Sequence, residues 1–358
     1  MRKVKIIAEA GVNHNGDIGL AEELVHAAHE SGADIVKFQT FSAEELVTLG
    51  ASQAPYQIKN TKIVETQFDM LRRLELSKDS HYRLMELSKN LGIEFLSTAF
   101  DNISLDFLIN ALSFKLLKIP SGEITNGSLI LQSAQSGSDL IVSTGMATLE
   151  EIEDALGVIA FGFTKKRHEK PSVASFKKAF SSNEGKDLLK EKVTLLHCTT
   201  DYPAQPEDIN LNAMNTLHEI FGLQVGYSDH SLGIEVSLAA VAKGANIIEK
   251  HFTMNKNLPG PDHKASLEPN ELKTMIECIR NIEVSFGDGI KRPQRSELLN
   301  KSVARKSLYA KKFIKKGEII EDSMISIKRP EEGISPMELW NLLGTEAKKD
   351  YKKGEVLK

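Results

Sequence analysis

Short apolar runs recur along the first three quarters of the chain, and each ends in residues that can bind ligands or transfer groups. The eight runs are KIIAEAGVNHNG, DIVKFQTF, IEFLSTAF, LLKIPSGE, LIVSTGMAT, VTLLHCTTDY, QVGYSDHS and NIIEKHFT. Segments with apolar residues at helical spacing separate them. This alternation predicts an α/β fold, the (β/α)8 or TIM barrel, whose active site lies at the carboxyl ends of the strands.

The predicted strands are short, and one connection between them is long. We expect strands at residues 4–8, 35–39, 94–97, 115–119, 140–143, 193–198, 224–227 and 247–250. The connection over residues 42–66 is long enough to indicate a functional or mobile loop. Thr148 and Glu151 form the T-x-x-E pattern of a helix N-terminus. A last helix over residues 269–286 is expected to close the barrel.

The pattern changes after residue 286, which predicts a second domain. Residues 1–286 are expected to form a catalytic barrel, with a polar, lysine-rich surface insertion at about residues 162–192. Residues 287–301 read as a polar linker. Residues 302–358, in which the turn sequence KKGE occurs twice, read as a small β-rich module. A chain of 358 residues is long enough for both domains.

Composition and charge narrow the range of partners. The 45 Lys and Arg residues and 49 Asp and Glu residues give a net charge of −4, so no global field favours nucleic acid or an anionic membrane. Cys198 and Cys278 lack metal-type spacing, and the N-terminus enters a strand without a signal-peptide pattern. Since no apolar run approaches the ~20 residues of a membrane helix, we expect a protein of the reducing cytoplasm.

Two histidines at neighbouring strand ends suggest a metal site. His230 and His251 lie one β/α repeat apart, and two imidazoles so placed could bind one divalent metal together. Taken singly, each would be an ordinary polar residue at a barrel rim. Asp229 is expected to support a histidine or to cap a loop. Alternation along the strands puts Glu249 on the same face as His251, but deeper in the barrel.

Two lysines inside apolar runs suggest an anion site. Lys37 and Lys118 end the second and fourth predicted strands, where an unpaired ammonium would be costly to bury. A bound anion between them would offset that cost. Hydroxyl groups suited to phosphate oxygens follow nearby strands, at Thr98, Ser121, Ser143, Thr199, Thr200 and Ser228. The sequence therefore predicts a phosphorylated or carboxylated substrate. The candidate acids are Glu9, Glu123 and Asp262.

These segments together resemble the bacterial sialic acid synthase family. The resemblance rests on IIAEAGVNHNGD, VKFQTF, APYQIKNT, KIPSGEITN, STGMAT, HCTTDYP, GYSDHS, IEKHFT, PGPDHKASLEP and KRPEEGISP, in that order along nearly the whole chain. It implies synthesis of a nonulosonic acid from phosphoenolpyruvate and an N-acylated mannosamine-type sugar. It also implies a C-terminal antifreeze-like (SAF) domain and a domain-swapped homodimer in which that domain covers the partner's active site.

The resemblance also implies roles for individual residues. It assigns a metal, usually Mn2+ with Mg2+ or Co2+ as alternatives, to His230 and His251. For the mechanism that follows from these roles, we expect Glu123 first, and Glu9 second, to transfer protons. Phosphoenolpyruvate contacts are implied for Lys37, Thr98, Lys118, Ser121, Ser143, Thr200 and Ser228. Sugar contacts are implied for Glu9, Gln39, Asn60, Tyr202, Asp262 and, from the other subunit, Arg329.

The expected reaction is a metal-assisted condensation with water that releases phosphate by C–O cleavage. N-acetylmannosamine, giving N-acetylneuraminic acid, is the first expectation for the acceptor. The alternative is 2,4-diacetamido-2,4,6-trideoxymannose, giving N,N'-diacetyllegionaminic acid. Thr200 stands where the family often has Asn, which leans slightly toward this alternative.

Two other classes of function fit parts of the sequence. The histidine pair and the anion site alone would suit a metal-dependent phosphosugar aldolase, but such an enzyme gives no role to the C-terminal module. A binding module for ice or carbohydrate, with the barrel as its carrier, is the non-enzymatic alternative. The lysine-rich turns of the module lack the flat threonine arrays of an ice-binding face.

Overall fold

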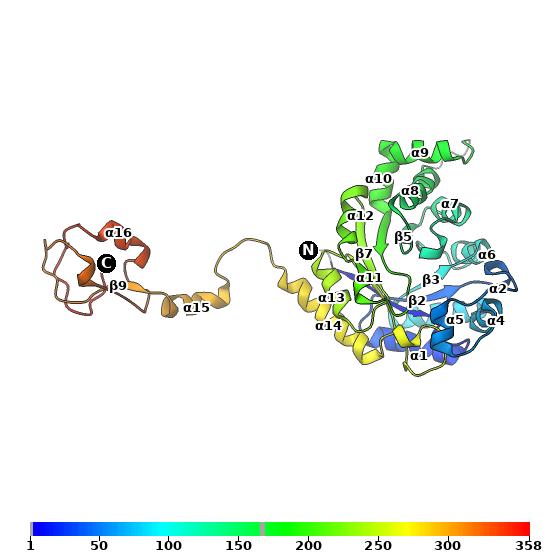
Figure 1. Cartoon of the computed structure of the whole chain (residues 1–358), viewed down its shortest axis with the longest axis horizontal. Coiled ribbons are helices and arrows are strands. Elements are labelled where there is room, and N and C mark those ends of the chain that lie inside the picture. Colours follow the sequence, from blue (N-terminus) through cyan, green and yellow to red (C-terminus); the bar gives the residue numbers. More distant parts are fainter. Residues whose placement is uncertain (1–2, 165–168) are drawn as a thin grey trace. The chain divides into compact units, whose positions relative to one another are not determined.

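The computed structural model describes residues 3–164 and 169–358. The chain divides into two compact units, Met1–Phe286 and Gly287–Lys358 (Figure 1). Residues 165–168 of the predicted surface insertion lie outside the described residues. None of the described helices is long and apolar enough to cross a membrane.

The first unit is a closed barrel of eight parallel strands, which confirms the predicted fold. The strands follow one another around the barrel in chain order, and the last pairs with the first. They are β1 (Lys5–Gly11), β2 (Ile35–Thr40), β3 (Glu94–Ala99), β4 (Leu116–Ile119), β5 (Asp139–Ser143), β6 (Val193–His197), β7 (Gln224–Asp229) and β8 (Ile247–His251).

Helices connect the strands and surround the barrel (Figure 1). The longer connecting helices are α1 (Ile18–Glu30), α5 (Lys78–Leu91), α7 (Gly127–Gln135), α8 (Leu149–Phe163), α12 (Ala213–Phe221), α13 (Glu235–Ala242) and α14 (Pro269–Ser285). Shorter helical elements in the connections are α6 (Asn102–Asp106), a π-helical turn Phe107–Ala111, α11 (Pro206–Ile209), and 3-10 turns at Ser121–Glu123 and His263–Ala265. Thr148 caps α8 in the predicted capping box, donating from its backbone N–H to Glu151 Oε2 at 2.8 Å.

The long connection after β2 and the lysine-rich insertion are both more helical than the sequence pattern indicates. The connection contains α2 (Ala43–Leu46) and α3 (Pro55–Thr61) and is followed by α4 (Gln67–Leu74). The insertion contains α9 (Val173–Ser181) and α10 (Asn183–Lys192). Ser172 and Ser182 cap these last two helices through their side-chain oxygens. The lysine-rich charge pattern, from which the surface insertion is predicted, does not contain this signal for a helix start.

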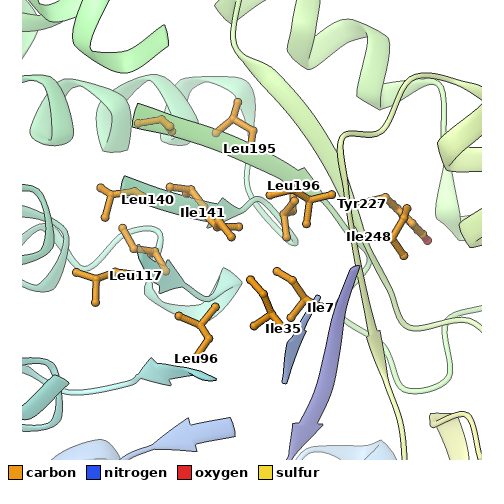
Figure 2. Packing of buried hydrophobic residues seen from close by; sticks show 14 of the residues in the cluster. Ile7, Ile35, Leu96, Leu117, Leu140, Ile141, Leu195, Leu196, Tyr227 and Ile248 are labelled. Atoms are coloured by element: carbon orange, nitrogen blue, oxygen red, sulfur yellow. The ribbon is translucent and has the colours of Figure 1, made fainter. Parts of the chain in front are cut away.

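Apolar side chains from the strands form the core beneath the strand ends. Figure 2 shows part of this cluster, to which strands all around the barrel contribute. The labelled members include Ile7, Ile35, Leu96, Ile141 and Leu196. Because side chains alternate along a strand, residues two positions farther toward the carboxyl end share a face with these apolar residues and lie nearer the barrel mouth. This packed floor therefore supports the polar strand ends.

A β-bulge interrupts the pairing of β1 with β2. Glu9 pairs with Lys37, but the next partner of Phe38 is Gly11, so Ala10 is an additional residue in β1. Gly11 adopts a φ of +53°, in the left-handed region that suits glycine. Glu9 also pairs with His251 of β8, on the other side of β1. The end of β1 therefore joins the second strand to the last one.

The second unit has its own hydrophobic cluster, built around Leu308, Ile314, Ile320 and Leu357. Its sheet contains two antiparallel strands, β9 (Ser307–Ala310) and β10 (Ile325–Lys328), and isolated bridges extend the pairing. Two 3-10 turns, Asp322–Met324 and Pro336–Glu338, and the short helix α16 (Leu339–Leu342) complete it. The predicted polar linker differs from the structure, because α15 (Arg295–Ala304) begins within it.

The two KKGE sequences form the same turn. In the first, the backbone N–H of Lys315 donates to Glu318 Oε2 at 2.8 Å. In the second, the backbone N–H of Lys352 donates to Glu355 Oε2 at 2.9 Å. In each, the glutamate N–H also donates to the carbonyl oxygen of the first lysine, at 2.9 Å. The repeated sequence therefore marks a repeated local structure.

Candidate functional site

Lys37 lies at the centre of a buried polar network at the carboxyl end of the barrel. Its ammonium is 2.6 Å from Glu9 Oε2 and 3.5 Å from Glu249 Oε2. It also donates to Thr98 Oγ1 at 3.0 Å. Gln39, two residues farther along β2, donates from Nε2 to Glu9 Oε1 at 3.3 Å. Residues from four strands are thus connected through one ammonium group.

Lys118 belongs to the same network through Glu249. Its ammonium donates to both carboxylate oxygens of Glu249, at 2.8 and 3.1 Å. Ser228 donates from Oγ to Glu249 Oε1 at 2.8 Å. Glu249 therefore bridges Lys118, Lys37 and Ser228 in the interior of the barrel.

This network changes the predicted picture of the lysines. The sequence predicts a bound anion that offsets the burial of Lys37 and Lys118, but the chain's own carboxylates pair with both. Burial by itself would raise the pKa of Glu249, yet the ammonium groups of Lys118 and Lys37 outweigh it and lower that pKa. Burial raises the pKa of Glu9, although Lys37 opposes the shift. Burial lowers the pKa of Lys118, although Glu249 opposes the shift. Burial also acts to lower the pKa of Lys37, but Glu249 and Glu9 outweigh it and raise that pKa. Lys37, beside a Glu9 carboxyl that is more easily protonated, therefore keeps positive charge for an anionic ligand.

Hydroxyl groups at the ends of β4, β5 and β6 lie beside this network. Ser121 Oγ accepts a hydrogen bond from the Gly145 N–H at 3.1 Å and lies 3.1 Å from Cys198 Sγ. Among the described residues, Ser143 Oγ and Thr200 Oγ1 are buried without a hydrogen-bond partner. A Cβ on Gly145 would lie 2.3 Å from Thr200 Oγ1, so only glycine fits there without a shift. Unpartnered hydroxyls grouped in this way suit oxygen atoms of a ligand.

His230 and His251 approach each other as the sequence predicted. Their ring centroids are 5.6 Å apart, and both side chains are buried. His230 Nδ1 is 2.7 Å from the Thr199 carbonyl oxygen. Because a carbonyl can only accept, Nδ1 carries the proton and Nε2 keeps its lone pair. Among the described residues, His251 Nδ1 is buried without a hydrogen-bond partner, and Asp262 Oδ2 lies 4.0 Å away.

The environment favours neutral imidazoles, the form that binds metal. Burial lowers the pKa of His230 to about 4. Burial also lowers the pKa of His251, and His230 adds to that shift. The described residues contain no ready-made cluster of three or more His, Cys, Asp or Glu side chains around one point. Two free imidazole lone pairs nevertheless fit a divalent ion whose remaining ligands would come from outside the protein.

Tyr202 and Asn60 connect the loops around the histidines. The Tyr202 ring stacks on His230 with centroids 4.1 Å apart and meets the His251 ring edge to face at 5.5 Å. Asn60 donates from Nδ2 to the carbonyl oxygens of Pro261 and Tyr202, at 2.7 and 3.3 Å. The Asn60 amide therefore holds α3 against two other loops. These two hydrogen bonds are enough to explain why Asn60 is buried, so its burial does not require a bound sugar.

A cavity of about 250 Å³ opens beside His251. Its polar lining includes Gln39, Tyr56, Tyr202, His251 and Asp262. Burial raises the pKa of Asp262 to about 7, and Glu9 contributes to the shift. Gln57 of α3 and Gln67 of α4 also line the cavity. The rest of the lining is mainly apolar and comes from the residues just after β1, β2 and β3, from the long connection and from α4, with Val12, Phe41, Leu46, Val47, Met70, Leu71, Leu74 and Phe100. The cavity thus has one polar wall and one apolar wall.

Neither Glu123 nor Arg329 takes part in the contacts described so far. Glu123 is in the 3-10 turn after β4, half-buried, where its Oε2 accepts from Asn126 Nδ2 at 2.7 Å. Thr200 and Cys198 also line a wider cavity of about 670 Å³ near the start of α8. Arg329 follows β10 in the second unit and is exposed.

Two residues at the site were not among the predicted site residues. Glu249 pairs with both lysines, and its position on the same strand face as His251 is a signal visible in the sequence. Tyr56 lines the cavity and packs against Tyr202 with ring centroids 5.1 Å apart. It lies in a motif that carries the family resemblance, but the long connection offers no periodicity that would orient its ring.

Comparison with known proteins gives the family. The model of the NeuB family matches residues 24–291, and the model of the SAF domain matches residues 305–358. The N,N'-diacetyllegionaminic acid synthase of Campylobacter jejuni is 48% identical over the whole of both chains. The enzyme of the same name from Legionella pneumophila is 47% identical over 98% of this chain and 92% of its own length.

Solved structures agree with this assignment. The N-acetylneuraminic acid (sialic acid) synthetase of Leptospira borgpetersenii, solved with citrate, is 35% identical, with a TM-score of 0.66 over 84% of this chain and 90% of that one. These relatives confirm the prediction of a sugar-acid synthase. The chain belongs to the NeuB family, and its second unit contains a SAF domain.

Proposed function

We propose that this chain condenses phosphoenolpyruvate with an N-acylated mannosamine-type sugar and water to give a nonulosonic acid and phosphate. The observation that carries the proposal is the convergence of two neutral imidazoles and two buried lysines around Glu249 at one end of a barrel. A simple hydrolase would not need both an anion site and an adjacent acceptor cavity. The relatives named as synthases of such sugar acids support the same reaction.

Phosphoenolpyruvate would occupy the lysine and hydroxyl side of the site. Lys37 and Lys118 supply positive charge, with Thr98 and Ser228 hydrogen-bonded within the same network. Ser121, Ser143 and Thr200 offer hydroxyls toward the phosphate or the carboxylate. Holding the enol in a fixed place would convert an encounter of two substrates into a directed attack of its C3 on the acceptor aldehyde.

His230 and His251 would hold the divalent ion, Mn2+ or alternatively Mg2+ or Co2+. When bound, that ion would act as a Lewis acid toward the acceptor carbonyl. The residues themselves fit this task because both imidazoles are neutral and one nitrogen of His251 has no partner among the described residues. The Thr199 carbonyl fixes the tautomer of His230, as hydrogen-bond partners of metal-binding histidines commonly do.

The protons would be handled by carboxyl groups of the chain. As C3 of phosphoenolpyruvate bonds to the aldehyde carbon, the former carbonyl oxygen takes up a proton, and water adding at C2 loses one. We assign these transfers to Glu123 first, on the β4 side, and to Glu9 second, beside Lys37 and Gln39. The C2–O bond to phosphate then breaks and phosphate leaves with that oxygen.

The acceptor we propose is 2,4-diacetamido-2,4,6-trideoxymannose, which gives N,N'-diacetyllegionaminic acid. Both relatives that are 47–48% identical carry that product in their names. The cavity beside His251 supports the choice, because its apolar wall suits the methyl groups of this sugar. Gln39, Tyr202 and Asp262 would meet the polar groups of the sugar, and Asn60 would act through the loops that it holds.

N-acetylmannosamine, the first expectation from the sequence, is the second candidate for the acceptor. The relative from Leptospira borgpetersenii supports this candidate, because it is named an N-acetylneuraminic acid synthetase. Its hydroxyl at C6 and its free hydroxyl at C4 would face the same apolar wall. The preference between the two acceptors is therefore a property of the cavity rather than of the lysine network.

Arg329 would complete the acceptor site in a domain-swapped homodimer, reaching the barrel of the other subunit. The helix α15 supports this proposal, because it has no buried residue and leaves Leu298, Leu299 and Val303 exposed. Such a face suits packing against a second copy of the chain. We place the assembled enzyme in the cytoplasm.

The deciding experiment measures phosphate release by the purified full-length chain with phosphoenolpyruvate, Mn2+ and each acceptor in turn. We expect release that depends on both substrates, with the higher kcat/KM for the diacetamido-trideoxy sugar. A higher kcat/KM for N-acetylmannosamine would reverse the choice of acceptor. Release without either sugar, or product formation without phosphoenolpyruvate as in an aldolase, would contradict the reaction itself. With 18O-labelled water, label in the product but not in phosphate is expected for C–O cleavage.

A further inference from the structure

A second ion pair lies at the same two strand ends as the histidines. Asp229 and Lys250 are paired residues of β7 and β8. Lys250 Nζ is 3.0 Å from Asp229 Oδ2, and both side chains are completely buried. Because successive residues of a strand point to opposite faces, this pair faces the surrounding helices while Ser228 and Glu249 face the barrel interior. The proposed reaction uses neither Asp229 nor Lys250 directly.

Both charged groups bind the residue that follows His230. Asp229 Oδ1 accepts from the backbone N–H and the hydroxyl of Ser231, at 2.9 and 2.6 Å. Lys250 Nζ donates to the Ser231 carbonyl oxygen at 2.6 Å. The second carboxylate oxygen, Asp229 Oδ2, accepts from Ser237 Oγ of α13 at 2.6 Å. The N–H, O–H and C=O groups of Ser231 are therefore all fixed by one ion pair.

The turn at Ser231 also contacts the loop that packs against His230. The His230 carbonyl oxygen accepts from the Ala204 N–H at 2.9 Å, and Ala204 forms a bridge with Ser231. This contact anchors the loop whose Tyr202 ring stacks on His230. A shift of Ser231 would therefore move both the imidazole of His230 and the ring that packs on it.

The energetics favour a positioning role over a stabilising one. Removing two charges from water costs about as much as their attraction returns, so a buried ion pair contributes little more to stability than a well-packed apolar pair. An apolar pair, however, could not bind the three polar groups of Ser231. We infer that Asp229 and Lys250 form a positioning pair that orients His230 relative to His251, so that both imidazole lone pairs meet at one divalent cation. This inference rests on the metal assignment in the proposed function.

Mn2+ affinity of the full-length, metal-free chain tests the inference, measured by calorimetric titration without substrates. The main variant is Asp229→Asn with Lys250→Met, which removes both charges and leaves no lone buried ion. We expect it to keep the wild-type circular dichroism spectrum and to bind Mn2+ about 10–100-fold more weakly, the usual effect of losing a partner behind a metal ligand. Ser237→Ala removes one donor to Asp229, and we expect a smaller, few-fold loss of affinity. The control is Asp34→Asn, which removes hydrogen bonds at the opposite ends of the strands and should leave Mn2+ affinity unchanged.

The possible results distinguish a failure of the positioning role from a failure of the proposed metal site. A folded double variant with wild-type Mn2+ affinity overturns the positioning role. If the double variant does not fold, Ser237→Ala decides, and an unchanged affinity in that variant overturns the role. Loss of Mn2+ binding in a His230→Ala, His251→Ala variant, with binding retained in Asp229→Asn, Lys250→Met, would leave the metal site standing and refute the positioning pair alone. A wild-type chain that binds no Mn2+ would refute both.

Discussion

Replacing Glu249 by Gln tests whether the buried charges at the site are balanced as the structure indicates. The carboxylate contacts Lys118 at 2.8 and 3.1 Å, Lys37 at 3.5 Å and Ser228 at 2.8 Å. Glutamine keeps the shape and one acceptor oxygen but leaves the Lys118 ammonium buried without an opposite charge. Removing one partner of a buried ion pair costs about 3–5 kcal/mol of unfolding free energy. The 286 residues of the first unit unfold with an entropy of about 0.6 kcal/mol/K, so the melting temperature should fall by about 5–8 °C.

The chain provides an internal control for this measurement. Its single tryptophan, Trp340, lies in the second unit, so its fluorescence reports on that unit, while far-UV circular dichroism follows mainly the helix-rich barrel. We expect Glu249→Gln to lower the dichroism transition and to leave the fluorescence transition in place. Lys118→Met combined with Glu249→Gln should lose less stability than the sum of the two single variants, because no unpaired charge remains at that contact. An unchanged melting temperature for Glu249→Gln would refute the view that Glu249 balances the buried charge of Lys118. So would a double variant whose stability loss equals the sum of the losses in the two single variants.

Three further substitutions test other parts of the structure. Gly145→Ala would place a Cβ 2.3 Å from Thr200 Oγ1, so steady-state kinetics should show at least a tenfold higher KM for phosphoenolpyruvate, and an unchanged KM would place the phosphate elsewhere. Leu71→Gln adds an amide to the apolar cavity wall and should reduce the kcat/KM preference for the trideoxy acceptor about tenfold. The exposed control Val64→Gln should leave that ratio unchanged, and an equal effect in both variants would refute the wall as its origin. Burial raises the pKa of Asp34, but hydrogen bonds from a lysine, a backbone N–H and an arginine outweigh it and lower that pKa. Asp34 therefore stabilises the fold above the unfolded-state pKa of about 3.9, and this contribution disappears as the pH falls through the lower folded-state pKa. In urea unfolding measured across about pH 2.5–7, the unfolding free energy of Asp34→Asn should fall less on acidification than that of the wild type. Identical pH profiles for the two proteins would contradict the assignment.

The barrel could be predicted from the sequence because its signals are local. Each strand is a short apolar run, each long connecting segment has helical periodicity, and the capping residues Thr148 and Glu151 mark the start of α8. Alternation along single strands was also enough to place His230 and His251 together. The helices α3 and α15 were missed, because they lie in polar segments whose apolar residues show no clear stripe.

The electrostatics of the site could not be predicted in the same way. The pairing of Lys118 with Glu249 joins residues 131 positions apart, and it depends on the registers of strands that do not neighbour each other. The sequence showed that both lysines needed an opposite charge, but it did not show whether a ligand or the protein supplies it. Asn60 illustrates the same limit, since its amide binds the backbone of two loops that are distant in the chain.

Glu9 pairs with Lys37 on one side of β1 and with His251 on the other, and the β1–β8 contact closes the barrel between segments more than 200 residues apart. Contacts so distant along the chain carry a high loop-closure entropy and form slowly compared with local ones. A nascent or partly folded chain can hold His230 or Lys37 in local structure, but it cannot assemble the complete site. The lysines, carboxylates and histidines of the candidate site therefore come together only when the barrel closes.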